Sequence, residues 1–514
     1  MRLLVVISML FSIFSAHADE KLAIETLLKR PFLDDYYSNV VFGYNIVTDT
    51  PKYAQRYVGN QLSCSSCHLQ SGTVEHAIPL NVAGLYPKWR DESGNRNGSG
   101  MRIRECFAYN QNGVMPPETA PEVLAVAAYI SYLSDGEIIG QPPEGRGVPK
   151  IETSNHQPDP ANGQLIYNEH CLSCHQNSND TPTQHALWGE HSYNKGSSMN
   201  KPETLAGYIW ANKAVNNQQK LSHEQALDVA AFINQQPRPD NPDHGKISTV
   251  RDRISPPDLS QRPELETLLS SEPDDTFYRN VVLGYNIVNN TQRYAKRYTG
   301  NSLNCTNCHL NAGRTKDAIP LNVTGIYPKW RNKNGRRNGI GLRIRECFAF
   351  SHNGIMPPEN APEVLAVAAY ISYLSVGEVI GVPPEGQGIP TLPSTAYDPN
   401  PANGKEVYMN QCAACHQQNG EGIPGIPPLW GMDSYNKGAG MNQIQKSASF
   451  IWANMPLGMG KTLTHQQALD VAAFLNLQIR PSDPREHRML KILEDLVTHV
   501  SMFLNKNAEQ AEAP

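Results

Sequence analysis

The 514-residue chain is poor in charged residues, in cysteine and in long apolar runs. Charged residues make up 18% of it and the formal net charge is −5, whereas ordinary soluble domains have about 25% charged residues. The lack of a basic excess disfavours a nucleic-acid-binding protein, and the low charge disfavours a disordered tail protein. Ten cysteines are too few for a disulfide scaffold of this length. At roughly 150 residues per domain, three or four domains are expected.

One apolar run stands out, at the N-terminus. Arg2 precedes an apolar stretch that ends at Phe14 and is followed by an A-x-A motif ending at Ala18. This arrangement is typical of a secretory signal peptide, and the run is shorter than the ~20 residues of a membrane-spanning helix. We therefore expect a signal peptide over residues 1–18 and a mature periplasmic protein without a membrane span.

The chain contains two similar halves. The sequence APEVLAVAAYISYLS occurs at 120–134 and again at 361–375, an offset of 241 residues. Proline-rich segments at 141–160 and 382–400 resist helix formation and divide each half again. The pattern predicts four compact units, at 27–140, 157–240, 268–381 and 398–482, and an amphipathic helix over 485–504.

The units are predicted to be helical. Thr119 and Asn360 each precede Ala-Pro-Glu, which is a helix-start pattern with proline in the first turn and glutamate three residues after the cap. Ser222 and Thr464 precede a second helix type that contains LDVAAF. Because no segment shows sustained alternation of apolar and polar residues, the expected fold class is all-α.

Eight of the ten cysteines lie in four copies of the motif Cys-x-x-Cys-His, the attachment pattern of c-type haem. Two thiols on one turn reach the two vinyl groups of a porphyrin, and the adjacent imidazole reaches the iron. Zinc knuckles and thioredoxin-like redox pairs are alternatives for a single match, but four matches in a repeated register favour four covalently bound haem c groups. The predicted thioether cysteines are Cys64, Cys67, Cys171, Cys174, Cys305, Cys308, Cys412 and Cys415, and the predicted proximal iron ligands are His68, His175, His309 and His416.

The second and fourth haems need sixth ligands from the small units that carry them. Met455 lies in Asn-Met-Pro ahead of the last LDVAAF helix, and methionine ligation is common in cytochromes c. The matching residue of the first half is Lys213, whose amine can bind iron when burial favours its neutral form. Alternatives are Met441 and Met459 for the fourth haem, and Lys195 and Met199 for the second.

Two cysteines lie outside the haem motifs. Cys106 and Cys347 each follow a motif histidine by 38 residues, within the sequence Arg-Ile-Arg-Glu-Cys-Phe. A disulfide between them would require a two-fold contact of the halves at these loops, and an inert buried thiol is a second alternative. Because neighbouring arginines favour a thiolate, we expect Cys106 and Cys347 to ligate the first and third irons, an arrangement that suits sulfur chemistry.

These motifs resemble a known family. C-x-x-C-H, R-I-x-x-C-F and N-G in one unit, followed by LWG, YN-x-G and N-M-P in a small cytochrome unit, are similar to dihaem thiosulfate dehydrogenases (the TsdA family) and, more distantly, to SoxA cytochromes. The resemblance covers both halves and implies a tandem, tetrahaem oxidoreductase. It further implies coupling of thiosulfate to tetrathionate, or the reverse, at the His/Cys haems, while the His/Met or His/Lys haems pass electrons to a small periplasmic redox partner. The implied catalytic residues are Cys106, Cys347, Arg102, Arg343 and Ser351.

The two halves differ around this predicted site. The loop 90–101 has no net charge, whereas its counterpart 331–342 carries four positive charges. Asn110 replaces Ser351 in the first half, and Tyr109 and Phe350 stand where the family has an arginine. These differences suggest that the C-terminal half is the better thiosulfate site. Arginines that could bind a small dianion are Arg90, Arg96, Arg102 and Arg104, and in the second half Arg331, Arg336, Arg337, Arg343 and Arg345.

Three other functions fit parts of the pattern. A multihaem electron-transfer cytochrome would not turn over thiosulfate. A SoxA-like enzyme would join thiosulfate to a carrier-protein thiol. A haem peroxidase needs an open distal side, which a cysteine ligand would close.

Overall fold

A computed structural model describes residues 21–486 except 31–32, 87, 91–94, 118, 153–155, 176–185, 213, 216–218, 242–261, 332–335 and 394–397. The predicted signal peptide at 1–18, Lys213 and nearly all of the predicted helix at 485–504 lie outside the described residues. No helix in the described part of the chain is both long enough and apolar enough to cross a membrane.

Helices dominate both halves, as the predicted all-α class requires. The longer helices of the first half are α3 (Asp35–Thr48), α6 (Ser99–Tyr109), α7 (Pro121–Leu133), α8 (Pro160–His170), α10 (Pro202–Asn212) and α11 (His223–Gln235). Those of the second half are α13 (Thr276–Asn289), α16 (Ile340–Phe350), α17 (Pro362–Leu374), α18 (Pro401–Gln411), α20 (Ile444–Asn454) and α21 (His465–Asn476). Helices of four or five residues are α2 (Ile24–Leu27), α4 (Thr50–Tyr53), α5 (Leu69–Gly72), α9 (Leu172–His175), α12 (Leu265–Leu269), α14 (Thr291–Tyr294), α15 (Leu310–Gly313) and α19 (Ala413–His416).

Strands occur only as short antiparallel pairs in the described residues. They are β1 (Lys88–Arg90) with β2 (Asn95–Asn97), β3 (Ala214–Val215) with β4 (Gln219–Lys220), and β5 (Lys329–Arg331) with β6 (Arg336–Asn338). Strands of two or three residues are too short to produce an alternating sequence pattern, so no sequence signal predicts them.

Pairs of crossed helices form the centre of each unit: α3 with α7, α8 with α11, α13 with α17 and α18 with α21. A glycine stands at each crossing. A Cβ added at Gly43 of α3 would lie 2.1 Å from the carbonyl oxygen of Ala125 in α7. Gly163, Gly284 and Gly404 occupy the matching positions, with corresponding distances of 2.0, 2.1 and 1.9 Å. The two helix backbones therefore touch directly, and four separate apolar cores form around the four crossings.

Two of the four predicted helix starts are confirmed and two are wrong. Ser222 and Thr464 cap α11 and α21 through reciprocal capping boxes with Gln225 and Gln467. By contrast, α7 and α17 begin one residue later than expected, after Ala120 and Ala361, without a side-chain cap. Proline at the first helical position has no N–H to satisfy and already has a helical φ, so these helices start without a capping side chain.

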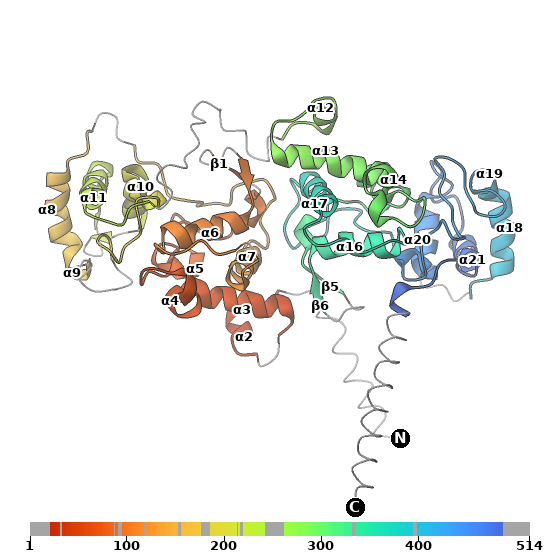
Figure 1. Cartoon of the computed structure of the whole chain (residues 1–514), viewed down its shortest axis with the longest axis horizontal. Coiled ribbons are helices and arrows are strands. Elements are labelled where there is room, and N and C mark those ends of the chain that lie inside the picture. The colour runs from red at the N-terminus through yellow and green to blue at the C-terminus, as the bar shows by residue number, and fades with distance from the viewer. Residues whose placement is uncertain are drawn as a thin grey trace, which may run out of the picture.

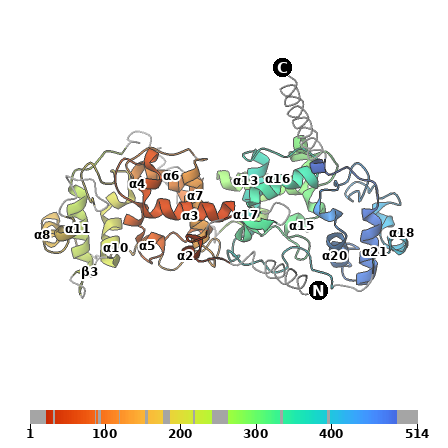
Figure 2. The same cartoon turned by 90° about the horizontal axis from the view of Figure 1, so that it is seen from below.

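The four units lie in a row. Figure 1 shows α8–α11 at one end, then α2–α7, then α12–α17, and α18–α21 at the other end. The view from below in Figure 2 has the same order. The units that carry Cys106 and Cys347 are therefore adjacent at the centre, and the small cytochrome-like units lie at the two ends.

A short antiparallel pairing joins the halves. Ile138 pairs with Val379, its counterpart at the repeat offset. The amides of Ile139 and Gly377 donate to the carbonyls of Glu378 and Ile139, and the matching bonds run from Ile380 to Glu137 and from Gly136 to Ile380. Because each half contributes the same segment, the joint has the geometry of a two-fold interface.

Each half also extends a hairpin onto the other half. Strand β6 contacts α3 of the first half and β2 contacts α13 of the second, and Figure 1 shows β1 beside α13 and β5–β6 beside α3. Arg337 of β6 lies with Nε 3.4 Å from a carboxylate oxygen of Asp34, and its guanidinium lies over the ring of Tyr37. Part of the positive charge of the 331–342 loop is thus placed against the first half.

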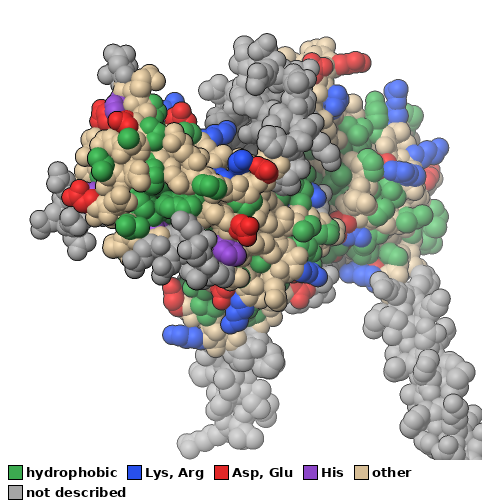
Figure 3. All heavy atoms as spheres, turned by 60° about the vertical axis from the view of Figure 1, so that its left-hand side comes forward, with side chains coloured by type: hydrophobic (Ala, Val, Ile, Leu, Met, Phe, Trp, Pro, Cys, Tyr) green, Lys and Arg blue, Asp and Glu red, His purple; other side chains and the backbone are tan. Residues whose placement is uncertain are grey.

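The surface lacks a large region of one charge sign on the face seen in Figure 3. Basic and acidic side chains there are interspersed and separated by apolar and uncharged ones. This distribution agrees with the low charge content of the sequence.

Candidate functional site

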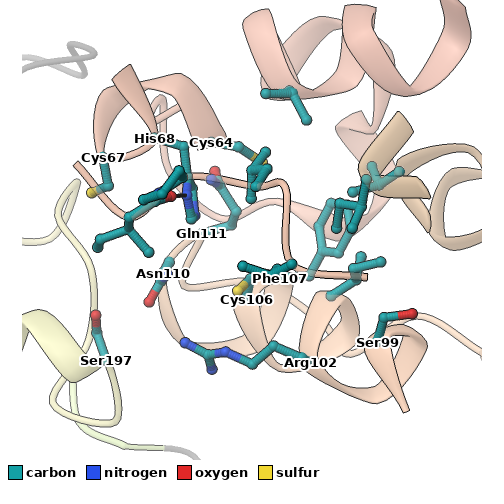
Figure 4. Close-up of a pocket in the computed structure, with 18 of the residues that line it drawn as sticks. Cys64, Cys67, His68, Ser99, Arg102, Cys106, Phe107, Asn110, Gln111 and Ser197 are labelled. Atoms are coloured by element: carbon teal, nitrogen blue, oxygen red, sulfur yellow. Dashed lines mark hydrogen bonds between the residues drawn. The ribbon is translucent and has the colours of Figure 1, made fainter. Parts of the chain in front are cut away.

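A cavity of about 310 Å³ brings together the predicted site residues of the first half. Cys64, Cys67 and His68 lie along one side of it, and Cys106 and Arg102 lie along the other (Figure 4). The motif cysteine Cys64 begins a 3₁₀ turn closed by a capping box, which fixes the turn before the histidine. Cys106 and the Cys-x-x-Cys-His motif therefore face the same cavity.

The motif histidines are held in the form that a metal ligand needs. The Nδ1 atoms of His68, His309 and His416 lie 2.5, 2.6 and 3.0 Å from the carbonyl oxygens of Ile78, Ile319 and Pro427, respectively. A proton on Nδ1 donated to the carbonyl leaves the Nε2 lone pair free for iron. Burial lowers the pKa of His68 and of His309 to about 4, so both rings are neutral at pH 7.

Helix α6 positions the cysteine and the arginine. Arg102 and Cys106 are four residues apart, and residues at that spacing lie on the same helix face. The charge of the Cys106 side chain is the largest cause of a raised pKa at Arg102. The guanidinium also lies 3.4 Å from a carboxylate oxygen of Glu105. Arg102 and Cys106 thus lie side by side on the wall of the cavity.

The second half repeats this arrangement on α16. Cys347 raises the pKa of Arg343 and that of the motif thiol Cys305, where desolvation is the larger cause. The charge of Arg343 contributes to the lowered pKa of His309, behind burial. Ser351 follows α16 directly as its C-cap. The residues predicted for the two catalytic centres are thus grouped in both halves.

Two predicted substrate arginines have another role. The Nε atoms of Arg104 and Arg345 each donate to a backbone carbonyl, of Pro116 and Pro357, at 2.7 Å. These bonds tie the helix to the loop that follows it. Arg102 and Arg343 are the arginines of this segment whose pKa values respond to the cysteines.

Sequence reasoning did not assign several residues to the first cavity that line it, and it named Met199 only as an alternative ligand of the second haem. Tyr193, Ser197 and Met199 come from the second unit, and Arg146 comes from the proline-rich segment. The second half has Gln387 at the position of Arg146. The Tyr-Asn-x-Gly motif was visible in the sequence, but nothing local indicates that it closes the neighbouring unit's cavity.

The predicted fourth haem site lies around a cavity of about 740 Å³. Cys412, Cys415, His416 and Met455 all line it. The alternative ligand Met441 lines the same cavity, whereas Met459 is 60% exposed and outside it.

The third and fourth haem sites share a wall. Cys308, the second motif cysteine of the third unit, also lines the cavity of the fourth. In the first half, Cys67 packs against the apolar core of the second unit in the same way. In both halves, the second cysteine of the first Cys-x-x-Cys-His motif therefore contacts the neighbouring small unit.

The second haem site is described in part. Cys171, Cys174 and His175 lie at the end of α8 and on α9. Of the two alternative ligands, Lys195 pairs with Asp240 at 2.7 Å, and Met199 lines the cavity of the first unit. Because Lys213 lies outside the described residues, it stays a prediction.

The donor set fits haem better than the alternatives. None of the ten cysteines is in a disulfide, so Cys106 and Cys347 are not joined to each other. Within the described ranges no three His, Cys, Asp or Glu side chains gather as a structural zinc ion requires. Paired thiols beside a neutral histidine, on the wall of an apolar cavity, suit a covalently attached porphyrin.

These features define a cytochrome of the c type. The family model for cytochrome c matches residues 160–237 and 401–477, so the protein binds haem c covalently. The thiosulfate dehydrogenase of Thiomonas intermedia (strain K12) is 43% identical over 222 residues, which cover 42% of this chain and 71% of that protein. That of Stutzerimonas stutzeri (strain A1501) is 41% identical over 219 residues, covering 41% and 71%.

The chain belongs to the thiosulfate dehydrogenase family, in tandem-duplicated form. A solved structure of a thiosulfate dehydrogenase (TsdBA) from Marichromatium purpuratum is similar with a TM-score of 0.41 and 26% identity, over 87% of this chain and 92% of that one. The matching thiosulfate dehydrogenase sequences confirm the predicted family and the class of oxidoreductase.

Proposed function

We propose that this protein is a periplasmic tetrahaem cytochrome that oxidises thiosulfate to tetrathionate. The observation that carries the proposal is the cavity in which Cys106 and Arg102 face a complete Cys-x-x-Cys-His motif. It is supported by the thiosulfate dehydrogenases that match the chain. Cys106 and Cys347 are the distal iron ligands in this proposal.

The reaction balances without a proton. Two thiosulfate dianions form one S–S bond between their terminal sulfurs, no bond breaks, and two electrons leave. The haem groups, when bound, accept these electrons one at a time. Arg102 and Arg343 supply the positive charge that holds the dianion by charge-assisted hydrogen bonds, and Ser351 offers a hydroxyl at the same site in the second half.

Electrons leave through the small units. Cys67 and Cys308 contact those units, so each catalytic centre adjoins the unit that would hold an outer haem. In this proposal His175 with Lys213 would hold the second iron, and His416 with Met455 would hold the fourth. A small periplasmic redox protein, such as a cytochrome c, takes the electrons. The signal peptide at 1–18 directs export.

Thiosulfate supplied alone, with an artificial electron acceptor, tests the function. The expected result is one tetrathionate for every two electrons delivered. An electron-transfer cytochrome would give no turnover, and a SoxA-like enzyme would require a carrier-protein thiol. Intact mass spectrometry of the mature protein should show four haem additions, and low-temperature EPR of the oxidised protein should show two thiolate-ligated low-spin signals. Three haem additions or fewer would contradict the tetrahaem proposal.

A further inference from the structure

A second cavity, of about 590 Å³, lies at the joint between the halves. The first half lines it with Lys21, Tyr36 and Tyr132, and the second half lines it with Lys329 and Arg337. Neither half forms this space by itself. Its walls include the hairpin β5–β6, helix α3, against which the hairpin packs, and helix α7.

This joint cavity adjoins the catalytic cavity of the first half. Tyr86 and Ser99 line both spaces. Ser99 is the first residue of α6, the helix that carries Arg102 and Cys106. A small solute in the joint cavity is therefore separated from the first catalytic centre by the side chains of these two residues.

The described lining of the joint cavity is positively charged. Three cations, Lys21, Lys329 and Arg337, stand against one lining carboxylate, Asp135. Lys21 lies 3.7 Å from Asp135, and Arg337 lies 3.4 Å from Asp34, which is set behind it. When Asp34 is counted with Asp135, the three cations still exceed the carboxylates by one positive charge. Clefts lined by one sign of charge concentrate counter-ions and raise their association rate.

We propose that the joint cavity is the entry site for the substrate anion of the first catalytic centre, with Lys329 and Arg337 of the second half acting on the reaction of the first. The ligand is a small sulfur oxyanion with two negative charges. It is held at the joint and passes between Tyr86 and Ser99 to Arg102. The inference rests on the proposed function, because it assumes that thiosulfate reacts at Cys106.

The test uses the full-length protein with one catalytic centre disabled. Lys329→Gln with Arg337→Gln is placed in a Cys347→Gly background, where the first centre works alone, and in a Cys106→Gly background, where the second works alone. In the first background we expect kcat/KM for thiosulfate to fall about fivefold at low ionic strength, mainly through KM. The loss should disappear in about 0.5 M salt, where surface charges are screened. In the second background the fall should be clearly smaller; some effect is expected there because Tyr327 lines the joint cavity and also raises the pKa of Arg343.

Controls separate charge from folding. Lys405→Gln removes an exposed lysine of α18 far from the joint and should leave kcat/KM unchanged in both backgrounds. Lys329→Arg keeps the charge and should retain the parent value. Equal losses in both backgrounds, or no loss in the Cys347→Gly background, would overturn the proposal. Intact haem content and an unchanged unfolding midpoint identify variants whose fold is preserved.

Calorimetric binding of thiosulfate to the oxidised protein distinguishes this proposal from the proposed function. If the parent binds thiosulfate but does not turn it over, and the Lys329→Gln, Arg337→Gln variant binds it more weakly, the joint cavity stands as a binding site for the anion and the proposed reaction fails. If the parent turns over thiosulfate and the variant is unaffected, the reaction stands and the entry site fails. If the parent neither binds nor oxidises thiosulfate, both fail.

Discussion

The two halves have the same backbone plan but differ in what they place at their joint. Counted along the sequence, the four positive charges of the 331–342 loop belong to the second half. In space, Arg337 lies against Asp34 and Tyr37 of the first half. The hypothesis that the C-terminal half is the better thiosulfate site loses part of its basis, because the positive charge of Arg337, counted with the second half, lies against the first half. A duplicated chain therefore has to be compared in its assembled form.

Removal of Cys106 and Cys347, the two cysteines outside the Cys-x-x-Cys-His motifs, is expected to have the largest effect. Cys106→Gly with Cys347→Gly should lower thiosulfate turnover about 10³-fold or more, as loss of a central reacting group does in other enzymes. Each single variant should keep about half of the parent turnover, because both centres have the same grouping of residues. Steady-state rates measure this. If one single variant loses all activity, the halves are functionally unequal.

The next comparison concerns one buried position that differs between the halves. His352 is 2% exposed, and its Nε2 atom lies 3.3 Å from Sγ of Cys305. Burial lowers its pKa from 6.5 to about 4, so as the pH falls the unfolded chain takes up the proton first. Stability contributed by the neutral ring is complete above pH 6.5 and is lost between pH 6.5 and 4, by about 3 kcal/mol in total.

The first half has Gln111 at the matching position, which provides the control. His352→Gln should remove this part of the loss of unfolding free energy between pH 7 and pH 4.5. Gln111→His should add a similar loss to the first half. Denaturant unfolding at the two pH values measures both changes. Identical pH dependence in the parent and the His352→Gln protein would contradict the expectation.

Replacing the glycine at a helix crossing by alanine is expected to destabilise the two halves equally. Gly43→Ala and Gly284→Ala each place a Cβ 2.1 Å from a carbonyl oxygen of the partner helix, and overpacking of this kind costs about 1–3 kcal/mol. Thermal unfolding should show a lower midpoint for both variants. Gly341→Ala, where nothing lies within 4 Å of the added Cβ, is the matched control and should not destabilise. A destabilised control would mean that the loss is unrelated to the crossing.

The smallest expected effect comes from changing the shape of the arginine that binds the substrate anion while keeping its positive charge. Arg102→Lys and Arg343→Lys replace a planar, two-pronged donor by a point charge. In the matching single-centre background, each should lower kcat/KM about tenfold, the equivalent of ~1.4 kcal/mol. An unchanged kcat/KM in either background would remove that arginine from the substrate site.

The sequence predicted features that depend on local chemistry. The haem motifs, the Ser222 and Thr464 caps and the spacing of Arg102 from Cys106 each lie within a few residues, and a short segment determines each of them. Thr119 and Asn360 were wrongly assigned as caps because the proline that follows them also appears in the usual capping pattern. The sequence pattern is compatible with either start, and α7 and α17 begin at the proline itself.

Features that depend on distant segments could not be predicted. Met199 was an alternative to Lys213 as a ligand of its own unit's haem, but it lines the cavity of the preceding unit. Arg337 was counted with its own half, and it contacts the other. Ile138 and Val379 carry no sequence signal that would mark them as partners. In each case the deciding neighbour is separated by tens to hundreds of residues, so no window along the chain contains both members.

The pairing of Ile138 with Val379 has a consequence for assembly in concentrated solution. Its two edges have almost the same sequence, Gly-Glu-Ile-Ile-Gly and Gly-Glu-Val-Ile-Gly, so each edge can pair with either edge of another molecule. Covalent linkage keeps the native partner at a high effective concentration and makes closure independent of protein concentration. A molecule whose joint opens exposes two self-complementary edges at once, and such molecules would link into open-ended chains.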